Sequence, residues 1–287
     1  MLKVDLRKAF DSIHWDFIKA LLKALHFPIV FTKWIMTCVS NVEFHLHLNG
    51  RIHGSFSGRR GLRQGDPLSP LLFVLAMEYF SRLMQKASLH PRCRHHPHCK
   101  ALNITHLMFA NDLILFSKAH VPTIHIIKEA LEQFSHSADL EANLHKSQIF
   151  IGGCSPTLHN HCLLASGFQE GALPMKYLGV PITASRLTKL ECSTLVEKIT
   201  ARVHIWATRN LSFAGRAMLI NGVIFGMFNY WASMFLLPQN VLEKITTICR
   251  NYLWGGTDDY SRAPHISWPT TCKGKKFGGI GTKDFAA

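Results

Sequence analysis

The sequence has few acidic residues, no paired cysteine motif and no apolar leader after Met1. Its 287 residues hold 18 Asp and Glu against 32 Lys and Arg, a formal net charge of +14. The eight cysteines are scattered without a CxxC pair, which argues against a small disulfide-bonded secreted scaffold. With no apolar segment behind Met1, we expect an intracellular protein, nuclear or cytoplasmic, with reduced thiols.

The composition also lacks the features of a disordered chain. Hydrophobic residues make up 47% and charged residues 17%, so the chain can bury a core. A protein this basic often binds a polyanion such as nucleic acid, although the same charge also aids solubility, and composition leaves both interpretations open. One uncharged run, 217–237, is long enough to span a bilayer. Asn221 and Asn229 lie inside it, so we expect a buried core helix, or two short ones.

Short strands and helices alternate along the first part of the chain. The apolar patterns, turn residues and caps predict strands at 2–6, 42–48, 51–57, 102–109, 112–117, 147–152 and 176–182. They predict helices at 14–25 (capped by Ser12), 29–40, from Pro67 and Pro70 to about 86, and 121–138. Asn49-Gly50 is a two-residue hairpin signal. From about 188 the pattern is mostly helical, with Trp206, Trp231 and Trp254 expected as large buried anchors.

Two acidic positions indicate chemistry. Asp5 ends the first predicted strand, and Asn111-Asp112 lies in a tight turn between two apolar strands. Carboxylates at neighbouring strand ends are how phosphoryl-transfer enzymes hold two Mg²⁺ ions, which prefer hard oxygen ligands. A single acid at a strand end is more often a solvated cap. We therefore expect Asp5 and Asp112 on adjacent strands, facing one cleft.

A basic, glycine-rich loop spans residues 58–66 (GRRGLRQGD) and leads directly into a predicted helix. Arginine side chains and the N–H groups of a helix start both favour phosphate. Taken alone, the loop could equally be an ordinary Gly/Pro connection.

The motifs together resemble one family. KVDLRKAFDSIHW, GLRQGDPLSPLLFVLAMEYFSRLM, HLMFANDLILFSKA, NLHKSQIF and PMKYLGVPI occur in this order. They resemble the successive palm motifs of non-LTR (LINE-type) retrotransposon reverse transcriptases, especially those of plants. The later stretches WATRNLSFAGRAMLINGVIFGMFNYWASMFLLP, NYLWGG and HISWPTTCKGKKFGGIGTKDF are similar to the region that follows the palm in those proteins.

The resemblance implies a fold and an activity. The fold is α+β: a right-hand polymerase palm over residues 1–175, then a primer-grip hairpin and a mainly helical, thumb-like region over 176–287. The activity is RNA-directed DNA polymerisation, a nucleotidyl transfer that extends a primer 3′-OH with dNTPs and two Mg²⁺ ions. The implied partners are an RNA template and a DNA primer, with no membrane.

The resemblance also assigns roles to residues. The metal ligands would be Asp5 and Asp112, and the catalytic set would include the Asn111 position and Lys146. Lys146 would lie near the triphosphate, although an exposed helix-end lysine is an equal interpretation. The nucleotide and template contacts would be Leu6, through its carbonyl, Phe10, Arg63, Gln64 and Gly65. Phe10 would exclude a ribose 2′-OH, and plain core packing is its alternative. The primer grip would be Tyr177, Leu178 and Gly179, and Asp11 would be structural.

This sequence departs from the family in two ways. The family pattern F-A-D-D reads Phe109-Ala110-Asn111-Asp112 here. Losing an anionic metal ligand should cost several kcal/mol, on the order of a thousandfold in rate. Met1 also lies close before Asp5, so we expect the family's fingers region to be missing. Both features predict a truncated, catalytically inactive copy. The alternative function is a non-catalytic, basic RNA- or DNA-binding remnant.

Histidine and cysteine crowd into residues 90–99. The members of this group are His90, Cys93, His95, His96, His98 and Cys99. Thiolate and imidazole could hold Zn²⁺, but the two cysteines lie six apart with a proline between them, and no second pair follows. We expect a loop that binds no metal, zinc included.

Overall fold

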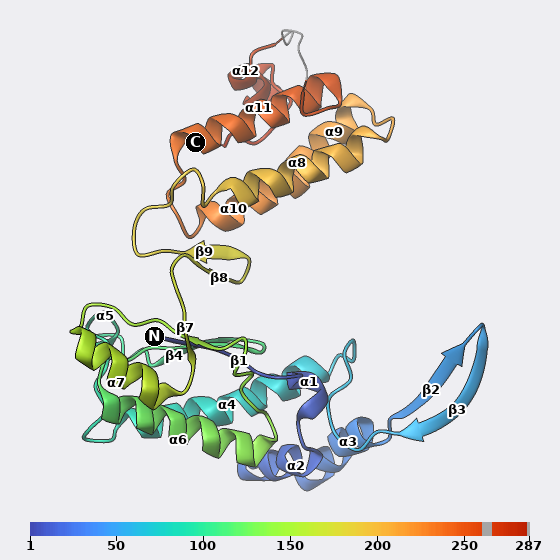
Figure 1. The fold of residues 1–287 in the computed structure, drawn as a ribbon. Coiled ribbons are helices and arrows are strands. Elements are labelled where there is room, and N and C mark those ends of the chain that lie inside the picture. Colours follow the sequence, from blue (N-terminus) through green and yellow to red (C-terminus); the bar gives the residue numbers. More distant parts are fainter. Residues whose placement is uncertain (260–265, 286–287) are drawn as a thin grey trace. The chain divides into compact units, whose positions relative to one another are not determined.

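The computed structural model describes residues 1–259 and 266–285, in two compact units, Met1–Ala172 and Leu173–Ala287 (Figure 1). Each unit is described by itself. The last quoted motif begins at His265, which lies outside the described residues.

The first unit is built on a five-stranded sheet with the order β4-β5-β1-β6-β7. Its strands are β1 (Leu2–Asp5), β4 (His106–Phe109), β5 (Asp112–Leu115), β6 (Gln148–Ile149) and β7 (Gln169–Glu170). All pairings are antiparallel except β6 with β7. Leu2 and Val4 of the central strand are buried and alternate with half-buried residues, because successive side chains point to opposite faces.

Helices pack against this sheet and supply most of the core (Figure 1). They are α1 (Ala9–Ser12), α2 (Trp15–Ala24), α3 (Ile29–Ser40), α4 (Ser69–Ser88), α5 (Pro97–Lys100), α6 (Val121–Ala138) and α7 (Pro156–Ser166). Helices α4 and α6 meet through Phe80 and Phe134, both fully buried, with ring centroids 5.1 Å apart. The unit therefore has the α+β architecture that the sequence predicts.

A two-stranded hairpin extends from the first unit (Figure 1). It consists of β2 (Glu43–Leu48) and β3 (Arg51–Ser57), and every residue of both strands is exposed. Asn49 and Gly50 have φ angles of 48° and 79°. Two consecutive positive φ angles are what a two-residue hairpin turn with the natural strand twist requires, so the turn prediction is confirmed.

The second unit combines a short hairpin with a helical core. Its elements are β8 (Met175–Tyr177), β9 (Val180–Ile182), α8 (Ser193–Ala207), α9 (Phe213–Leu219), the π-helix η1 (Ile220–Ile224), α10 (Phe225–Ala232), α11 (Gln239–Gly255), α12 (Trp268–Cys272) and the 3₁₀ helix η2 (Lys275–Phe277). Trp231 and Tyr252 are buried in this core. Trp206 and Trp254 pack against this core but are only half-buried, so of the three predicted anchors Trp231 alone is buried.

The apolar run 217–237 forms core rather than a span. Most of it lies in α9, η1 and α10, which follow one another without a break. Ile220, Ile224, Phe228 and Trp231 are buried at helical spacing, as the prediction of a buried helix requires. In the part of the chain that the structure describes, no helix is long and apolar enough to cross a membrane.

Several predicted boundaries are wrong for local reasons. Ser12 ends α1 instead of capping the next helix, and the His14 ring accepts the Asp16 N–H at the start of α2. The strand predicted at 102–109 begins only at His106, after Asn103 adopts a left-handed φ of 49°. The strand predicted at 147–152 is reduced to Gln148–Ile149. Helix α7, capped by the Ser155 side chain, was not predicted.

Candidate active site and nucleic-acid interface

The two predicted acidic positions meet in the sheet. Strands β1 and β5 pair antiparallel, and Asp5 is the register partner of Asp112. Both residues are half-buried. The turn before β5 places Ala110 at a φ of 49°, and the Leu6 N–H donates to the Asn111 carbonyl at 3.0 Å. The predicted juxtaposition of Asp5 with Asn111-Asp112 is therefore confirmed.

The Asn111 amide interacts with the neighbouring carboxylate. Its Nδ2 donates to Asp5 Oδ2 at 3.4 Å. An aspartate at this position would instead add a third carboxylate to Asp5 and Asp112, which is favourable only when a cation lies between them. Asn111 thus relieves charge repulsion in the absence of a cation and removes one anionic ligand in its presence.

A tight turn of residues 143–147 fixes the backbone of Asp5. The Asn143 N–H donates to the Asp5 carbonyl at 2.7 Å, and the Asp5 N–H donates to Ser147 Oγ at 3.2 Å. Ser147 is fully buried, whereas Lys146 is exposed. The supporting roles of Asn143 and Ser147 were not predicted, although both belong to the NLHKSQIF motif. This contact brings Lys146 into the segment that adjoins Asp5.

The oxygen atoms around Asp5 are suitable ligands for a hard cation such as Mg²⁺. The carboxylates of Asp5 and Asp112 and the side-chain oxygen of Asn111 are ligand types that Mg²⁺ accepts, and Mg²⁺ takes its remaining ligands from water or phosphate. Within residues 1–259 and 266–285, no three His, Cys, Asp or Glu residues gather as a metal-binding group. The residues therefore fit Mg²⁺ with one anionic ligand fewer than the F-A-D-D pattern.

In the 90–99 cluster, Cys99 Sγ lies 3.9 Å from His96 Nδ1.

Phe10 links the first motif to the core and to the basic loop. Its ring stacks on Phe73 of α4, with centroids 4.6 Å apart and an interplanar angle of 19°. Its carbonyl accepts the Leu62 N–H at 2.6 Å. Phe10 is half-buried, so its ring packs in the core and also keeps an accessible part. The structure thus supports core packing for Phe10.

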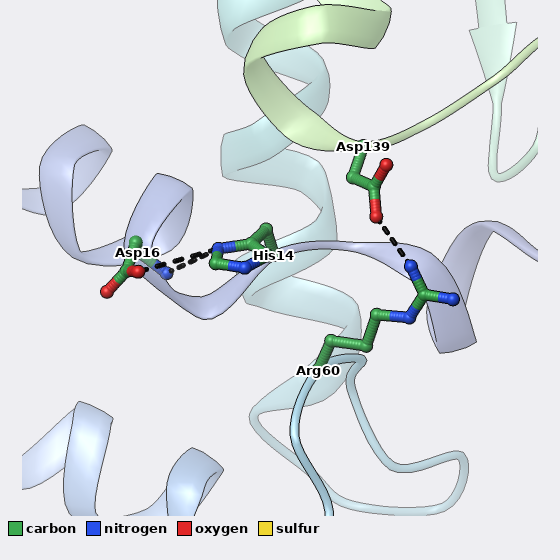
Figure 2. A network of polar contacts seen from close by, with 4 residues as sticks. All are labelled: His14, Asp16, Arg60 and Asp139. Atoms are coloured by element: carbon green, nitrogen blue, oxygen red, sulfur yellow. Dashed lines mark hydrogen bonds and ion pairs between the residues drawn. The ribbon is translucent and has the colours of Figure 1, made fainter.

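The basic loop is partly neutralised by carboxylates. Arg60 Nη1 lies 2.6 Å from Asp139 Oδ2 at the end of α6, and Figure 2 shows this pair beside the His14–Asp16 contact. Arg63 Nη2 lies 3.2 Å from Asp66 Oδ2. A guanidinium has five donors, so each arginine keeps donors for a further partner. Asp66 is also occupied by the Leu68 N–H at the start of α4.

Gln64 and Gly65 lie in the same loop, before α4, and both are exposed. Arg60 also lines an open polar cleft of about 310 Å³. The cleft is lined by Arg7, Lys8, Ser12, Arg60, Asp139 and Glu141. Arg7 and Lys8 directly follow Leu6 in the first motif. Sequence reasoning singled out neither Arg7 nor Lys8, although the RK pair in the first motif was a visible signal.

The predicted primer-grip residues form a real hairpin turn, in the second unit. Tyr177 ends β8, and Leu178 and Gly179 have φ angles of 48° and 84°. The Tyr230 hydroxyl donates to the Leu178 carbonyl at 2.6 Å and ties this turn to α10.

Comparison with known proteins gives one family match. The family model described as "Reverse transcriptase (RNA-dependent DNA polymerase)" matches residues 1–182. The chain is 26% identical over 89% of its length to the "Transposon TX1 uncharacterized 149 kDa protein" of Xenopus laevis, and covers 19% of that protein. It is 26% identical over 87% of its length to a "Retrovirus-related Pol polyprotein from type-2 retrotransposable element R2DM" of Drosophila melanogaster, and covers 24% of it.

A third relative is the Pol polyprotein of a type-1 retrotransposable element R2 from Popillia japonica, 32% identical over 40% of this chain and 18% of that protein. The chain thus spans about a fifth of the length of these relatives. Among solved structures, a telomerase from Candida tropicalis in complex with an RNA fragment superposes with a TM-score of 0.48 and 10% identity, over 81% of this chain and 38% of that one.

Proposed function

The chain belongs to the reverse transcriptase (RNA-dependent DNA polymerase) family, and from this we propose that it forms the palm of an RNA-directed DNA polymerase that binds an RNA template and a DNA primer. The observation that carries the proposal is the register pairing of Asp5 with Asp112 at the ends of β1 and β5. The pairing supports this assignment because two carboxylates at adjacent strand ends can share cations.

The site residues have two proposed roles, holding Mg²⁺ and binding phosphate. Asp5 and Asp112 would hold Mg²⁺, which when bound stabilises the charge on the attacking and leaving oxygens of nucleotidyl transfer. The exposed Lys146, in the turn that fixes Asp5, is suited to contact the triphosphate. Arg63, Gln64 and Gly65 present donors ahead of α4, where phosphate is favoured.

We further propose that this copy transfers nucleotides poorly. Asn111 supplies a neutral oxygen in place of a carboxylate, and its amide donates to Asp5. A deficit of several kcal/mol in stabilisation of the transition state corresponds to roughly a thousandfold loss in rate. The phosphate-binding donors are unaffected, so the protein would keep its affinity for template and primer.

The experiment is single-nucleotide addition to a labelled DNA primer on an RNA template with Mg²⁺, together with binding of the same duplex. The variants are Asn111→Asp, Asp5→Ala and the double variant, with Asp16→Ala as an exposed acidic control on α2. We expect template–primer binding by all of them. We expect synthesis near background for the wild type and an increase with Asn111→Asp that is lost in the double variant.

The outcomes separate the two parts of the proposal. Absence of template–primer binding at low salt would overturn the proposed function. Robust synthesis by the wild type, lost on Asp5→Ala, would confirm the polymerase and overturn the claim that Asn111 disables it. Synthesis that persists after Asp5→Ala would reject the site.

A further inference from the structure

The β2–β3 hairpin carries large apolar side chains outside the core. Phe44 is 42% exposed, Leu46 53%, Leu48 58% and Phe56 54%. A two-stranded hairpin is marginally stable by itself in water. Exposed apolar side chains in such number on one element mark an interaction surface.

These side chains share one face of the hairpin. Phe44 pairs with Phe56, and Leu46 pairs with His53. Directly opposite residues in an antiparallel pair point to the same face, and so do residues two apart along a strand. The rings of Phe44 and Phe56 are stacked, with centroids 5.4 Å apart and an interplanar angle of 22°. At the tip, Leu48 pairs with Arg51 and places a cation on the same face.

The face continues into the basic loop. A cleft of about 220 Å³ at the base of the hairpin has Asp11, Trp15, Phe44, Arg60 and Arg63 in its lining. Phe44 thus belongs both to the hairpin face and to this cleft. Arginines therefore flank the aromatic pair at both ends: Arg51 at the tip, and Arg60 and Arg63 at the base.

The charge of this region selects its partner. Residues 43–63 contain four arginines against a single acidic residue, Glu43. Arg60 and Arg63 already face Asp139 and Asp66, but each guanidinium keeps donors for a further partner. A second copy of this chain would bring like charges together on a protein of net charge +14, which opposes self-association. Aromatic rings flanked by arginines are suited to bind a molecule that has both flat rings and negative charges. Single-stranded nucleic acid has both, in its bases and its phosphates.

We propose that the β2–β3 hairpin binds single-stranded nucleic acid, with bases stacked on Phe44 and Phe56 and phosphates held by Arg51 and the basic loop. The inference rests on the proposed function and adds to it the element that receives the unpaired strand. Stacking on aromatic side chains tolerates any base, so the binding is independent of sequence.

The test is fluorescence anisotropy with labelled oligouridylate RNA over a salt titration. Phe44→Ala/Phe56→Ala should weaken binding about tenfold or more, because the bases lose the aromatic rings on which they stack. The dependence on salt should stay unchanged, because stacking releases no counterions. Arg51→Ala should weaken binding and also lower the salt slope by about one.

Two control variants and one further measurement separate the loss of stacking from unfolding of the hairpin and from self-association. Phe44→Tyr/Phe56→Tyr retains the rings and should bind like the wild type, even if the alanine pair disorders the hairpin. Phe31→Ala removes an aromatic ring of similar exposure, 43%, from α3 and is the matched control. Sedimentation of each variant reports self-association.

Each outcome bears on a different claim. If the wild type binds oligouridylate and the alanine pair binds equally well, the hairpin proposal is overturned and the proposed function stands. If the alanine pair changes the oligomeric state and leaves RNA binding unchanged, the hairpin proposal is also overturned, because the hairpin face would then bind a second copy of the chain. If the wild type binds neither oligouridylate nor template–primer, the proposed function itself fails.

Discussion

Asp5 and Asp112 are register partners on β1 and β5, and the Asn111 amide donates to Asp5 from the turn between β4 and β5. An acidic pair with an amide beside it is stable without a cation, whereas a third carboxylate at this place requires one. An aspartate at position 111 should therefore make the stability of the site depend on Mg²⁺, and this can be measured apart from any activity.

Asn111→Asp should lower the thermal midpoint when divalent ions are absent and restore it with Mg²⁺. Two unit charges about 4 Å apart repel by about 1 kcal/mol even in water. A bound cation reverses the effect, because ligands of the native state stabilise it by mass action. The measurement is thermal unfolding with EDTA or Mg²⁺, and Asn160→Asp, on the exposed side of α7, is the control. An equal response of both variants to Mg²⁺ would contradict the prediction.

Asp139→Asn should raise the affinity for single-stranded RNA by freeing Arg60. Asp139 ends α6 with a left-handed φ of 59°, a conformation that asparagine also adopts readily. An exposed ion pair contributes less than about 1 kcal/mol, so the unfolding free energy should change little. A modest gain, about twofold, is expected by anisotropy, and none when Arg60→Ala is already present. A gain that survives in the Arg60→Ala background would show that Asp139 acts by another route.

Gly61→Ala should destabilise the first unit more than Gly65→Ala. Both glycines have a φ near +90°, so both substitutions carry the strain of a left-handed conformation, about 1–2 kcal/mol. At Gly61 the new Cβ would also lie 2.8 Å from the Asp11 carbonyl oxygen, whereas nothing lies within 4 Å at Gly65. Denaturant unfolding gives the unfolding free energy of each variant, and the difference between the two values is the cost of the steric clash at Gly61. Equal losses would mean that the loop moves freely away from α1.

Phe80→Ala should cost about 3–5 kcal/mol of unfolding free energy, because it leaves a cavity between α4 and α6. Phe80 is fully buried against Phe134 and meets the His106 ring at 5.8 Å. Leu164→Ala, at a side chain 79% exposed on α7, is the control and should change stability by less than about 0.5 kcal/mol. Guanidinium titration compares the two, and similar midpoints would refute the packing described here.

Acid should destabilise the protein partly through His106. Burial lowers the pKa of this imidazole, and Glu78 opposes the shift in part. As pH falls below about 6.5, the unfolded chain binds a proton at this residue more readily than the folded one, so stability decreases. The unfolding free energy of His106→Gln should therefore fall less between pH 7 and pH 5 than that of the wild type. His125→Gln, at an exposed position on α6, is the control. Parallel pH profiles for all three proteins would contradict the assignment.

The sequence alone determined the elements whose signals are local. The Asn49-Gly50 turn, the helix at 121–138 and the buried face of residues 217–232 follow from turn chemistry and periodicity. The motif order identified the family, and the residue type at position 111 identified the missing carboxylate. These features depend only on neighbours along the chain, so no tertiary information was needed.

Tertiary structure decided what depends on contacts between distant segments. The support of Asp5 by Asn143 and Ser147, and the capture of Arg60 by Asp139, join residues far apart in sequence. The strand predicted at 147–152 is short because β7 pairs with only two of its residues, and because the turn of residues 143–147 bonds the backbone of Asp5 in place of a strand. Charge counting from the sequence treats every arginine in the loop as available. Only the fold shows that two of them already face carboxylates, because ion pairing depends on distance and not on composition.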